Sequence, residues 1–353
     1  MTEIDEKPVL VDVRNTTGIL TLNRPRALNS LTPDMVAIIA DALDAWRDDD
    51  RITQVLIHSA SEKGFCAGGD VRLARDLELA GKGDEADAFF ADEYEMNEAI
   101  AKYPKPYIAV LDGVVMGGGV GLSLHGSHRV VTDKAFMAMP EMHIGFVTDI
   151  AAAWSAQRVV GTRGKASPAL AKFWVITGYR QFAADMLWTG LATHLVDDAQ
   201  ETIDAIVEKG VDAALGELAR EPQGDAPLAD AVPIIERTFT RGDWESIARA
   251  VRESGDADFA QKVGELTSQA GPTSLVASAA LCDAEENLDD VGDALRLECE
   301  LGEFMRHRRD FAEGVRAVLV DKKPDADFDP ATVGAVDKDA IAAVIDSALR
   351  PDA

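Results

Sequence analysis

The stretch Asp112–Gly126, DGVVMGGGVGLSLHG, sets three consecutive glycines, Gly117 to Gly119, and a fourth at Gly121 among apolar residues. Glycine allows backbone conformations that other residues rarely adopt, and it lets a ligand atom approach the main chain closely. An apolar, strand-like run precedes these glycines and a helix-like run follows them. We therefore expect a strand, a turn and a helix, with backbone N–H groups at the helix start available to a bound molecule.

A second glycine loop, Gly64–Asp70 with the sequence GFCAGGD, also follows an expected strand and precedes an expected helix. Two backbone N–H donors aimed at one point form an oxyanion hole. The glycines alone fit two tight turns with close helix–strand packing equally well. No Gly-Lys-Ser/Thr follows either loop, and neither matches the dinucleotide-binding pattern well, so a nucleotide-phosphate loop is not expected.

Strands alternate with helices over roughly residues 1–200, which favours an α/β fold with crossover connections. Thr32 fits a helix N-cap with Pro33 in the first turn. From about residue 201 to 353 the segments have helical periodicity without clear strands. We expect an α/β core at 1–200 and a helical C-terminal region at 201–353. The expected elements of the core are strands within 8–23, 53–60, 105–113 and 128–139, and helices within 33–46, 71–80, 82–103 and 120–126.

Composition excludes several classes of function. The net charge is −27 over 353 residues, which argues against nucleic acid and anionic membrane surfaces as partners. No apolar run reaches the length of a membrane span, and the acidic N-terminus does not read as a secretory signal. Three widely spaced cysteines fit neither a disulfide framework nor a zinc site. We expect a cytoplasmic protein.

Four segments resemble the enoyl-CoA hydratase/isomerase (crotonase) superfamily: Ile19–Leu31, Gly64–Arg72, Lys105–Thr132 and Met139–Gly145. Within it, MGGGVGLSLHG, GLATHLVD and DFAEGVRAVLVDK are most similar to the 3-hydroxyisobutyryl-CoA hydrolases. The resemblance extends from about residue 10 to about residue 323 and is weakest across 200–265. It implies an α/β crotonase-like fold of repeated ββα units with a helical C-terminal region.

The resemblance also implies roles for single residues. Gly69 and Gly118 would supply the N–H groups that hold the thioester oxygen, and the backbone of Ala67 would meet the adenine of coenzyme A. Arg24 and Arg26 would contact phosphates, although an exposed arginine is as often simply solvated.

The reaction depends on which carboxylates are present. Hydratases of this superfamily typically use two glutamates to add one water across a double bond. Here the first position corresponds to Gly121, whereas the second is retained as Glu141. A single glutamate beside an oxyanion hole fits acyl transfer to water, with Glu141 as general base or as a nucleophile that forms an acyl anhydride.

Two further acidic residues match the hydrolase branch. Asp149 would hold the substrate hydroxyl or orient the water, but it also fits a cap of the helix that follows. Glu93 would contact substrate, but it lies on an acidic helix whose charged face is as easily solvated. The three histidines His125, His128 and His143 match no metal motif, and Cys66 has no catalytic partner set, so structural roles are expected.

One departure from the hydrolase pattern borders the expected acyl pocket. Thr148 stands where that branch has proline, and Ala151–Ala153 replace glycines. Each alanine adds a methyl group and stiffens the helix start, so the acyl group can differ from 3-hydroxyisobutyryl.

The sequence therefore predicts an acyl-CoA thioester hydrolase, with 3-hydroxyisobutyryl-CoA of valine breakdown as the leading substrate. No metal or redox cofactor is expected, because coenzyme A belongs to the substrate and the oxyanion hole supplies the electrophilic assistance. The alternatives are an enoyl-CoA hydratase/isomerase and a non-catalytic acyl-CoA-binding protein. Relatives often form trimers or hexamers, so a homo-oligomer is one expectation. A tail after about residue 270 that folds over its own active site is the other.

Overall fold

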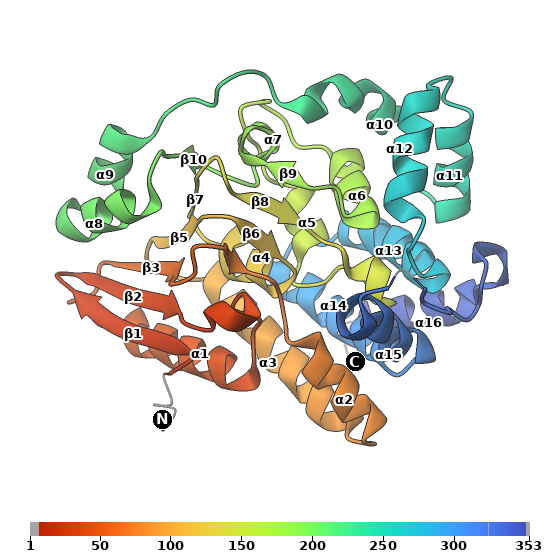
Figure 1. The fold of residues 1–353 in the computed structure, drawn as a ribbon, viewed down its shortest axis with the longest axis horizontal. Helices are drawn as coiled ribbons and strands as arrows, with labels where there is room; N and C mark the ends of the chain where they lie inside the picture. Colours follow the sequence, from red (N-terminus) through yellow and green to blue (C-terminus); the bar gives the residue numbers. More distant parts are fainter. Residues whose placement is uncertain (1–6, 324, 351–353) are drawn as a thin grey trace.

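The computed structural model describes residues 7–323 and 325–350, which form an α/β structure with two sheets and helices around them (Figure 1). The strands are β1 Val9–Arg14, β2 Thr17–Leu22, β3 Gln54–Ser59, β4 Gly64–Cys66, β5 Tyr107–Leu111, β6 Val114–Met116, β7 His128–Val131, β8 Phe136–Ala138, β9 Gln181–Phe182 and β10 His194–Leu195. The helices of the first part are α1 Pro33–Arg47, α2 Val71–Leu79, α3 Gly83–Ala101, α4 Gly118–Leu124, α5 Ala152–Ala156, α6 Pro168–Thr177 and α7 Ala183–Thr189. Those of the remainder are α8 Ala199–Lys209, α9 Val211–Leu218, α10 Val232–Thr238, α11 Trp244–Arg252, α12 Ala257–Thr267, α13 Pro272–Glu285, α14 Val291–Arg306, α15 Arg309–Val315 and α16 Lys338–Ala348.

The larger sheet has the order β1-β2-β3-β5-β7-β10. Its first pair is the expected antiparallel hairpin, which turns at Asn15 with a φ of 53°. The other neighbours are parallel, so each connection crosses over through other elements. The predicted N-cap is confirmed, because the Thr32 side chain accepts a hydrogen bond from the Met35 N–H.

The smaller sheet, β4-β6-β8-β9, is built from strands of two or three residues. The stretch 128–139, which we expected as one strand, divides into β7 in the larger sheet and β8 in the smaller one. The first glycine loop likewise contains a strand of its own, β4. These strands were missed because three residues give no measurable period-two alternation.

Between β3 and α5 the chain alternates between the two sheets, so that a strand of the larger sheet is followed by a strand of the smaller one and then by a helix. The three units are β3-β4-α2, β5-β6-α4 and β7-β8-α5. This is the predicted repeat of ββα units. Because β4 and β6 pair in parallel, the first residues of the helices that follow these two strands lie close together.

Helices cover both sides of this framework (Figure 1). The helices α8 and α9 pack an apolar cluster onto the outer face of the larger sheet. On the other side, α14 packs against α3 and α15 against α2. The main hydrophobic core runs from Val9 to Ala348 and includes residues of both the α/β part and the later helices. The proposed division into domains at residue 200 stays a prediction.

Among the described residues, no helix has both the length and the apolar composition needed to cross a membrane.

Candidate active site

The two glycine loops meet at the ends of β4 and β6. Gly68 has a φ of 104° and Gly117 a φ of 48°, so both need the conformational freedom of glycine. A Cβ atom on Gly68 would lie 3.4 Å from the Gly117 Cα and 3.5 Å from the Gly118 N. The loops therefore touch, and no side chain separates them.

Gly69 and Gly118, which the resemblance implies as the oxyanion donors, both line the junction of the two loops. Gly118 is the first residue of α4, a position without an intrahelical acceptor for its N–H. Gly69 follows the tight turn at Gly68. On either side of it, the Leu31 N–H donates to the Gly68 carbonyl and the Asp70 N–H donates to the Leu31 carbonyl. Within the described part of the chain, neither N–H has a hydrogen-bond partner. This geometry suits a pair of oxyanion donors.

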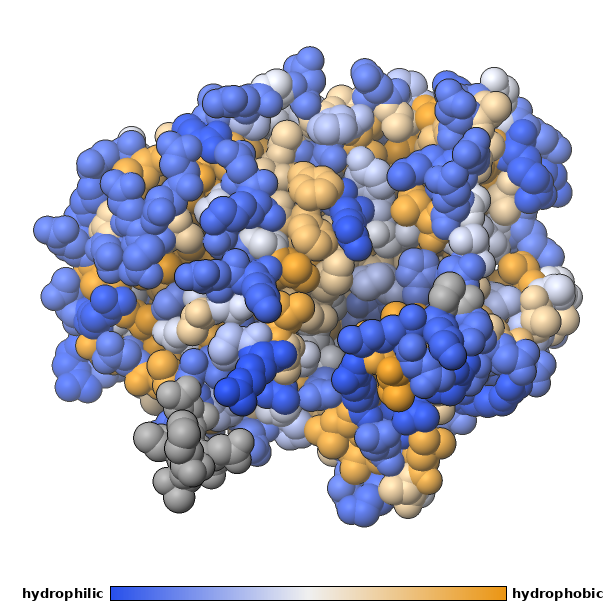
Figure 2. All heavy atoms as spheres, in the orientation of Figure 1, coloured by the Kyte–Doolittle hydropathy of each residue, from blue (hydrophilic) through white to orange (hydrophobic). Residues whose placement is uncertain are grey.

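A cavity of about 350 Å³ opens at this junction. Its lining combines the two glycine loops, an apolar wall and three carboxyl groups, a composition typical of small-molecule sites. The lining residues are Ala67, Gly68, Gly69, Val71, Phe90, Glu93, Met116, Gly117, Gly118, Pro140, Glu141, His143, Ile144, Phe146, Asp149, Arg180, Val318 and Leu319. Figure 2 shows the mostly hydrophilic face of the molecule, which is hollowed and paler near the middle of the view.

Glu141 opens a short 3-10 helix, Glu141–Ile144, directly after β8. Its carboxyl is buried, with Oε1 3.2 Å from the position of a Cβ on Gly117 and Oε2 without a partner among the described residues. Burial, and then the charges of Asp149 and Glu93, raise the pKa of Glu141 well above its usual range. A carboxyl of this kind beside an oxyanion hole is suited to proton transfer.

Asp149 is also buried, and its Oδ2 accepts a hydrogen bond of 2.9 Å from the Tyr94 hydroxyl. The alternative of a helix cap is wrong, because the N-cap of α5 is Ala151, and it is the carbonyl of Asp149 that accepts from Ala152. Burial raises the pKa of Asp149 to about 6, against the opposing effect of the Tyr94 hydrogen bond.

Glu93 lies on the side of α3 that faces the cavity, with 2% of its surface exposed, so a solvated position is excluded. Its Oε1 would be 2.1 Å from a Cβ on Gly118, and its Oε2 3.5 Å from one on Gly69. Burial, and then the charge of Asp149, raise its pKa to about 8. Glu93 therefore occupies the space that the two oxyanion glycines leave open.

The space beside Gly121, where a hydratase would carry the glutamate that this chain lacks, is filled by a side chain of α3. A Cβ on Gly121 would lie 2.8 Å from the Asn97 Oδ1 and 2.9 Å from its Nδ2. Asn97 is fully buried, and neither atom of its amide has a partner among the described residues. A glutamate side chain has no room at residue 121 unless Asn97 moves.

The departures from the hydrolase pattern lie in one turn next to Asp149. The Thr148 hydroxyl donates to the Val175 carbonyl at 3.1 Å, and Thr148 is buried. Ile150 and Ala151 both have positive φ, 58° and 51°. Alanine thus stands at a left-handed position that glycine would occupy without strain.

The predicted phosphate contacts are not part of this cavity. Arg24 pairs with Asp70 at 3.4 Å and donates to the Ser30 carbonyl at 2.5 Å, whereas Arg26 is exposed. Of the described arginines, the one that lines the cavity is Arg180. The roles of Arg24 and Arg26, and of the Ala67 backbone, stay predictions.

The histidines and Cys66 have structural positions. His125 bonds the Ile150 carbonyl, His143 bonds the Leu266 carbonyl, and His128 stacks on His194 with 5.8 Å between ring centroids. Burial raises the pKa of the Cys66 thiol to about 12, which fits a packing residue.

Sequence reasoning missed the residues that reach the cavity from distant parts of the chain. Tyr94 is buried beside Asp149, and Val318 and Leu319 line the cavity from a one-turn π-helix, Arg316–Asp321. The Leu319 carbonyl accepts from Arg72, and the Ala312 carbonyl accepts from Arg75 at 3.0 Å. No local pattern marks these residues, because long-range packing brings them to the site.

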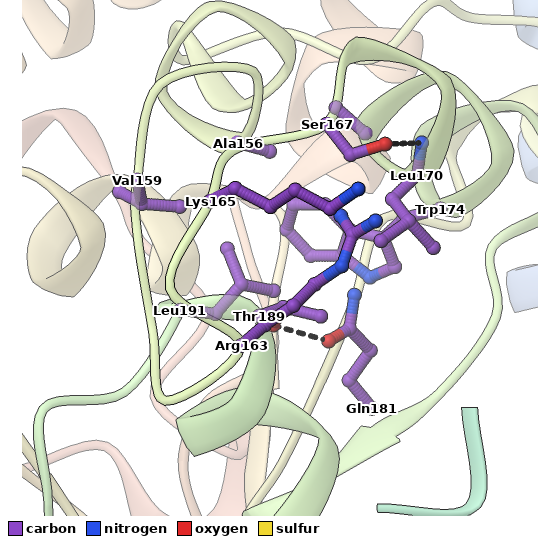
Figure 3. Close-up of a pocket in the computed structure, with 11 residues that line it drawn as sticks. Ala156, Val159, Arg163, Lys165, Ser167, Leu170, Trp174, Gln181, Thr189 and Leu191 are labelled. Carbon is purple, nitrogen blue, oxygen red and sulfur yellow. Dashed lines mark hydrogen bonds between the residues drawn. The ribbon is translucent and has the colours of Figure 1, made fainter. Parts of the chain in front are cut away.

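A smaller cavity lies between α6 and the segment before it, and it is too small for an acyl group. It measures about 20 Å³, which is room for a single water molecule. Figure 3 shows Arg163 and Lys165 extending along it toward Trp174. Arg163 is held by Glu236, so its charge already has a partner.

Comparisons with known proteins identify the family and the fold of this chain. The family model for enoyl-CoA hydratase/isomerase matches residues 17–345. The "3-hydroxyisobutyryl-CoA hydrolase, mitochondrial" of Danio rerio is 34% identical over 342 residues, covering 93% of this chain and 86% of that protein. The human protein of the same name is 33% identical over 92% of this chain and 84% of its own length.

Among solved structures, a carnitinyl-CoA dehydratase from Mycobacterium thermoresistibile has a TM-score of 0.88 and 36% identity, with 96% of both chains covered. An enoyl-CoA hydratase from Rhodobacter sphaeroides has a TM-score of 0.86 and 29% identity, with 96% of this chain and 97% of that chain covered. The fold, the paired glycine loops and these matches together show that the chain belongs to the enoyl-CoA hydratase/isomerase family and has the crotonase fold.

Proposed function

We propose that this protein hydrolyses acyl-CoA thioesters, with 3-hydroxyisobutyryl-CoA as its leading substrate. The observation that carries the proposal is Gly121, which supplies no carboxyl group, and the buried Asn97 amide occupies the space beside it. The names of the relatives at 33% and 34% identity support the same substrate.

In this reaction the Gly69 and Gly118 N–H groups hold the thioester oxygen as negative charge develops on it. A water oxygen attacks the carbonyl carbon, the C–S bond breaks, and the products are a carboxylic acid and the free thiol of coenzyme A. Glu141 and Asp149 line the same cavity, and burial and then the charge of Asp149 favour the protonated form of Glu141. One carboxylate then takes a proton from the water, and the protonated partner supplies one to the departing sulfur.

The nucleotide part of the substrate has a suitable place beside the acyl cavity. A hollow of about 590 Å³ shares His143, Val318 and Leu319 with it and is also lined by Arg72, Lys322 and Lys323. These three basic side chains stand out in a chain of net charge −27 and are suited to phosphate groups. We propose that the arm of coenzyme A that joins the nucleotide to the acyl group passes between the two spaces along Val318 and Leu319.

The test of the proposed function is release of free thiol from 3-hydroxyisobutyryl-CoA. We expect release by the unmodified protein and a loss of about a hundredfold or more in Glu141→Gln, with binding of the CoA ester retained. The matched control Glu62→Gln alters an exposed glutamate and should leave release unchanged. Hydration of crotonyl-CoA without thiol release would overturn the proposal.

A hydratase or dehydratase is the second candidate, because the structural neighbour at 36% identity is named a carnitinyl-CoA dehydratase. It would have to work with Glu141 and Asp149 in place of two facing glutamates. A non-catalytic binding protein would bind CoA esters without turning over either substrate.

No metal or redox group enters the proposed reaction, so dialysis against EDTA should leave thiol release unchanged. We also propose a cytoplasmic location, for which the free cysteines give support. The animal relatives are named mitochondrial, and immunodetection in cell fractions distinguishes the two compartments. A homo-oligomer stays a prediction that sedimentation velocity checks.

A further inference from the structure

The peptide group between Ile150 and Ala151 follows directly after Asp149 and is held in a strained conformation. The φ angles of its two residues are 58° and 51°. A left-handed conformation costs a non-glycine residue about 1–2 kcal/mol. Two such residues in succession persist only where surrounding groups fix them.

One half-buried and one fully buried side chain bind this one peptide group, one at its carbonyl and one at its N–H. The Ile150 carbonyl accepts a hydrogen bond of 2.7 Å from His125 Nε2. The Ala151 N–H donates a hydrogen bond of 2.6 Å to Glu298 Oε2. His125 is the C-cap residue of α4, the helix that begins with Gly118, and Glu298 lies in the middle of α14. We call these two side chains the peptide clamp.

The protonation state of His125 suits its part in the clamp. Burial lowers the pKa of His125 to about 4, so the ring is neutral. A carbonyl only accepts, so Nε2 carries the hydrogen. Nδ1 then accepts from the Ser155 hydroxyl at 3.3 Å. The tautomer is thereby fixed by its two partners.

Glu298 is fully buried, and so is Glu285, which lies at the end of α13. Burial raises the pKa of Glu285 to about 7 and that of Glu298 well above its usual range. The charges of Glu285 and Asp149 further oppose ionisation of Glu298, whereas Arg158 favours ionised Glu285. Protonated Glu298 keeps a carbonyl oxygen that accepts from the Ala151 N–H.

We propose that His125 and Glu298 are positioning residues, whose clamp on the Ile150–Ala151 peptide holds Asp149 in place in the acyl cavity. The Asp149 side chain accepts a hydrogen bond from Tyr94, and the clamp holds the peptide group that begins one residue later. The inference rests on the proposed function, because it assigns these residues to the same reaction.

The first experiment compares two replacements of Glu298. Leucine removes the acceptor for the Ala151 N–H, so kcat/KM for thiol release should fall about tenfold to a hundredfold, as displaced reacting groups do. Glutamine has the same shape and keeps an oxygen that accepts from the Ala151 N–H, so we expect it to stay within about threefold of the unmodified protein. Glu303→Gln, at an exposed position on the same helix, is the matched control and should have no effect. Equal losses in the leucine and glutamine variants would overturn the proposal.

The second experiment tests whether the effect passes through Asp149. In an Asp149→Asn background, Glu298→Leu should cost less than about twofold further, because the group that it positions is already lost. An undiminished loss in that background would contradict the clamp and would indicate a general structural role. If Glu298→Leu does not fold, amide exchange of the unmodified protein decides: slow exchange at Ala151 supports the clamp, and exchange as fast as that of exposed loops overturns it.

Failure of the clamp and failure of the proposed function are distinguishable. If the unmodified protein hydrates crotonyl-CoA and releases no thiol, the proposed function fails, and the same pair of variants is measured on hydration. If it does neither, binding of the 3-hydroxyacyl-CoA ester is the readout. Coupling between Glu298 and Asp149 in any of these readouts supports the clamp, and its absence overturns it.

Discussion

Gly118 and Gly121 lie one turn apart on α4. At each of them, a polar side chain of α3 fills the space that a side chain on the glycine would need. Glu93 reaches toward Gly118, and Asn97 reaches toward Gly121. The first contact lies in the cavity, beside an N–H group that has no partner among the described residues, whereas the second is sealed within the packing of the two helices. Gly118 therefore borders the cavity, whereas Gly121 makes room for a neighbouring helix.

The largest effect is expected from Gly118→Ala. A Cβ here would lie 2.1 Å from Glu93 Oε1 and 2.9 Å from Leu31 Cδ1, so the oxyanion site must distort. We expect thiol release to fall about a hundredfold, the size of a lost oxyanion donor. Gly216→Ala on α9, where no atom lies within 4 Å of the new Cβ, is the control. Activity close to that of the unmodified protein would show that Gly118 is not at the reacting centre.

Gly121→Ala should affect stability more than catalysis. The new methyl group meets the Asn97 amide at 2.8 Å, and overpacking of this kind costs about 1–3 kcal/mol in the free energy of unfolding. Denaturant unfolding measures the loss, and Asn97→Ala in the same chain should relieve part of it. A fully stable Gly121→Ala that has lost thiol release would place Gly121 in the reaction and remove the contrast with Gly118.

Glu93 and Asn97 should also differ in how their contributions to the free energy of unfolding depend on pH. The pKa of Glu93 is raised from 4.5 to about 8, so between these values the folded protein holds a proton that the unfolded chain has released. Stability due to this group is therefore present below pH 4.5 and is lost as pH rises through 8. Glu93→Gln should raise the free energy of unfolding relative to the unmodified protein, by at least about 1 kcal/mol more at pH 8 than at pH 5. Asn97→Ser should show no such difference between the two pH values.

The smallest effect is expected at Ala151, where the backbone has a left-handed conformation that favours glycine. Ala151 has a φ of 51°, so Ala151→Gly should raise the free energy of unfolding by about 0.5–1 kcal/mol. Ala152→Gly, one residue further and within α5, should lower it by about the same amount. Thermal unfolding of the pair measures both signs. A loss of stability in Ala151→Gly would show that the surroundings prefer the methyl group to the relief of strain.

The parts of the fold that depend on local sequence could be predicted. The hairpin, the Thr32 cap and the turn before α4 follow from residues close together in the chain, and each is present in the structure. The smaller sheet could not be predicted, because its strands are too short to give a periodic signal. The resemblance supplied Gly69, Gly118, Glu93, Glu141 and Asp149, and the structure places all five around one cavity.

The remaining parts of the site come from tertiary packing. The sequence around Asp149 fits a helix cap, whereas its side chain bonds the hydroxyl of Tyr94, 55 residues earlier in the chain, and the N-cap is Ala151. Glu298 reads as one acidic residue among many on an amphipathic helix, yet it is fully buried and bonds a residue 147 positions away. Burial of a charged residue type is invisible to sequence periodicity, because the helix itself looks ordinary.

The most direct measurement of the central claim is the ratio of thiol release to hydration by the unmodified protein under one set of conditions. 3-Hydroxyisobutyryl-CoA reports thiol release, and crotonyl-CoA reports hydration. Because the space at Gly121 is occupied by Asn97, we predict that thiol release exceeds hydration by about a hundredfold or more. Hydration at an equal or higher rate would contradict the account, since it would show that water addition does not need the glutamate that Gly121 replaces.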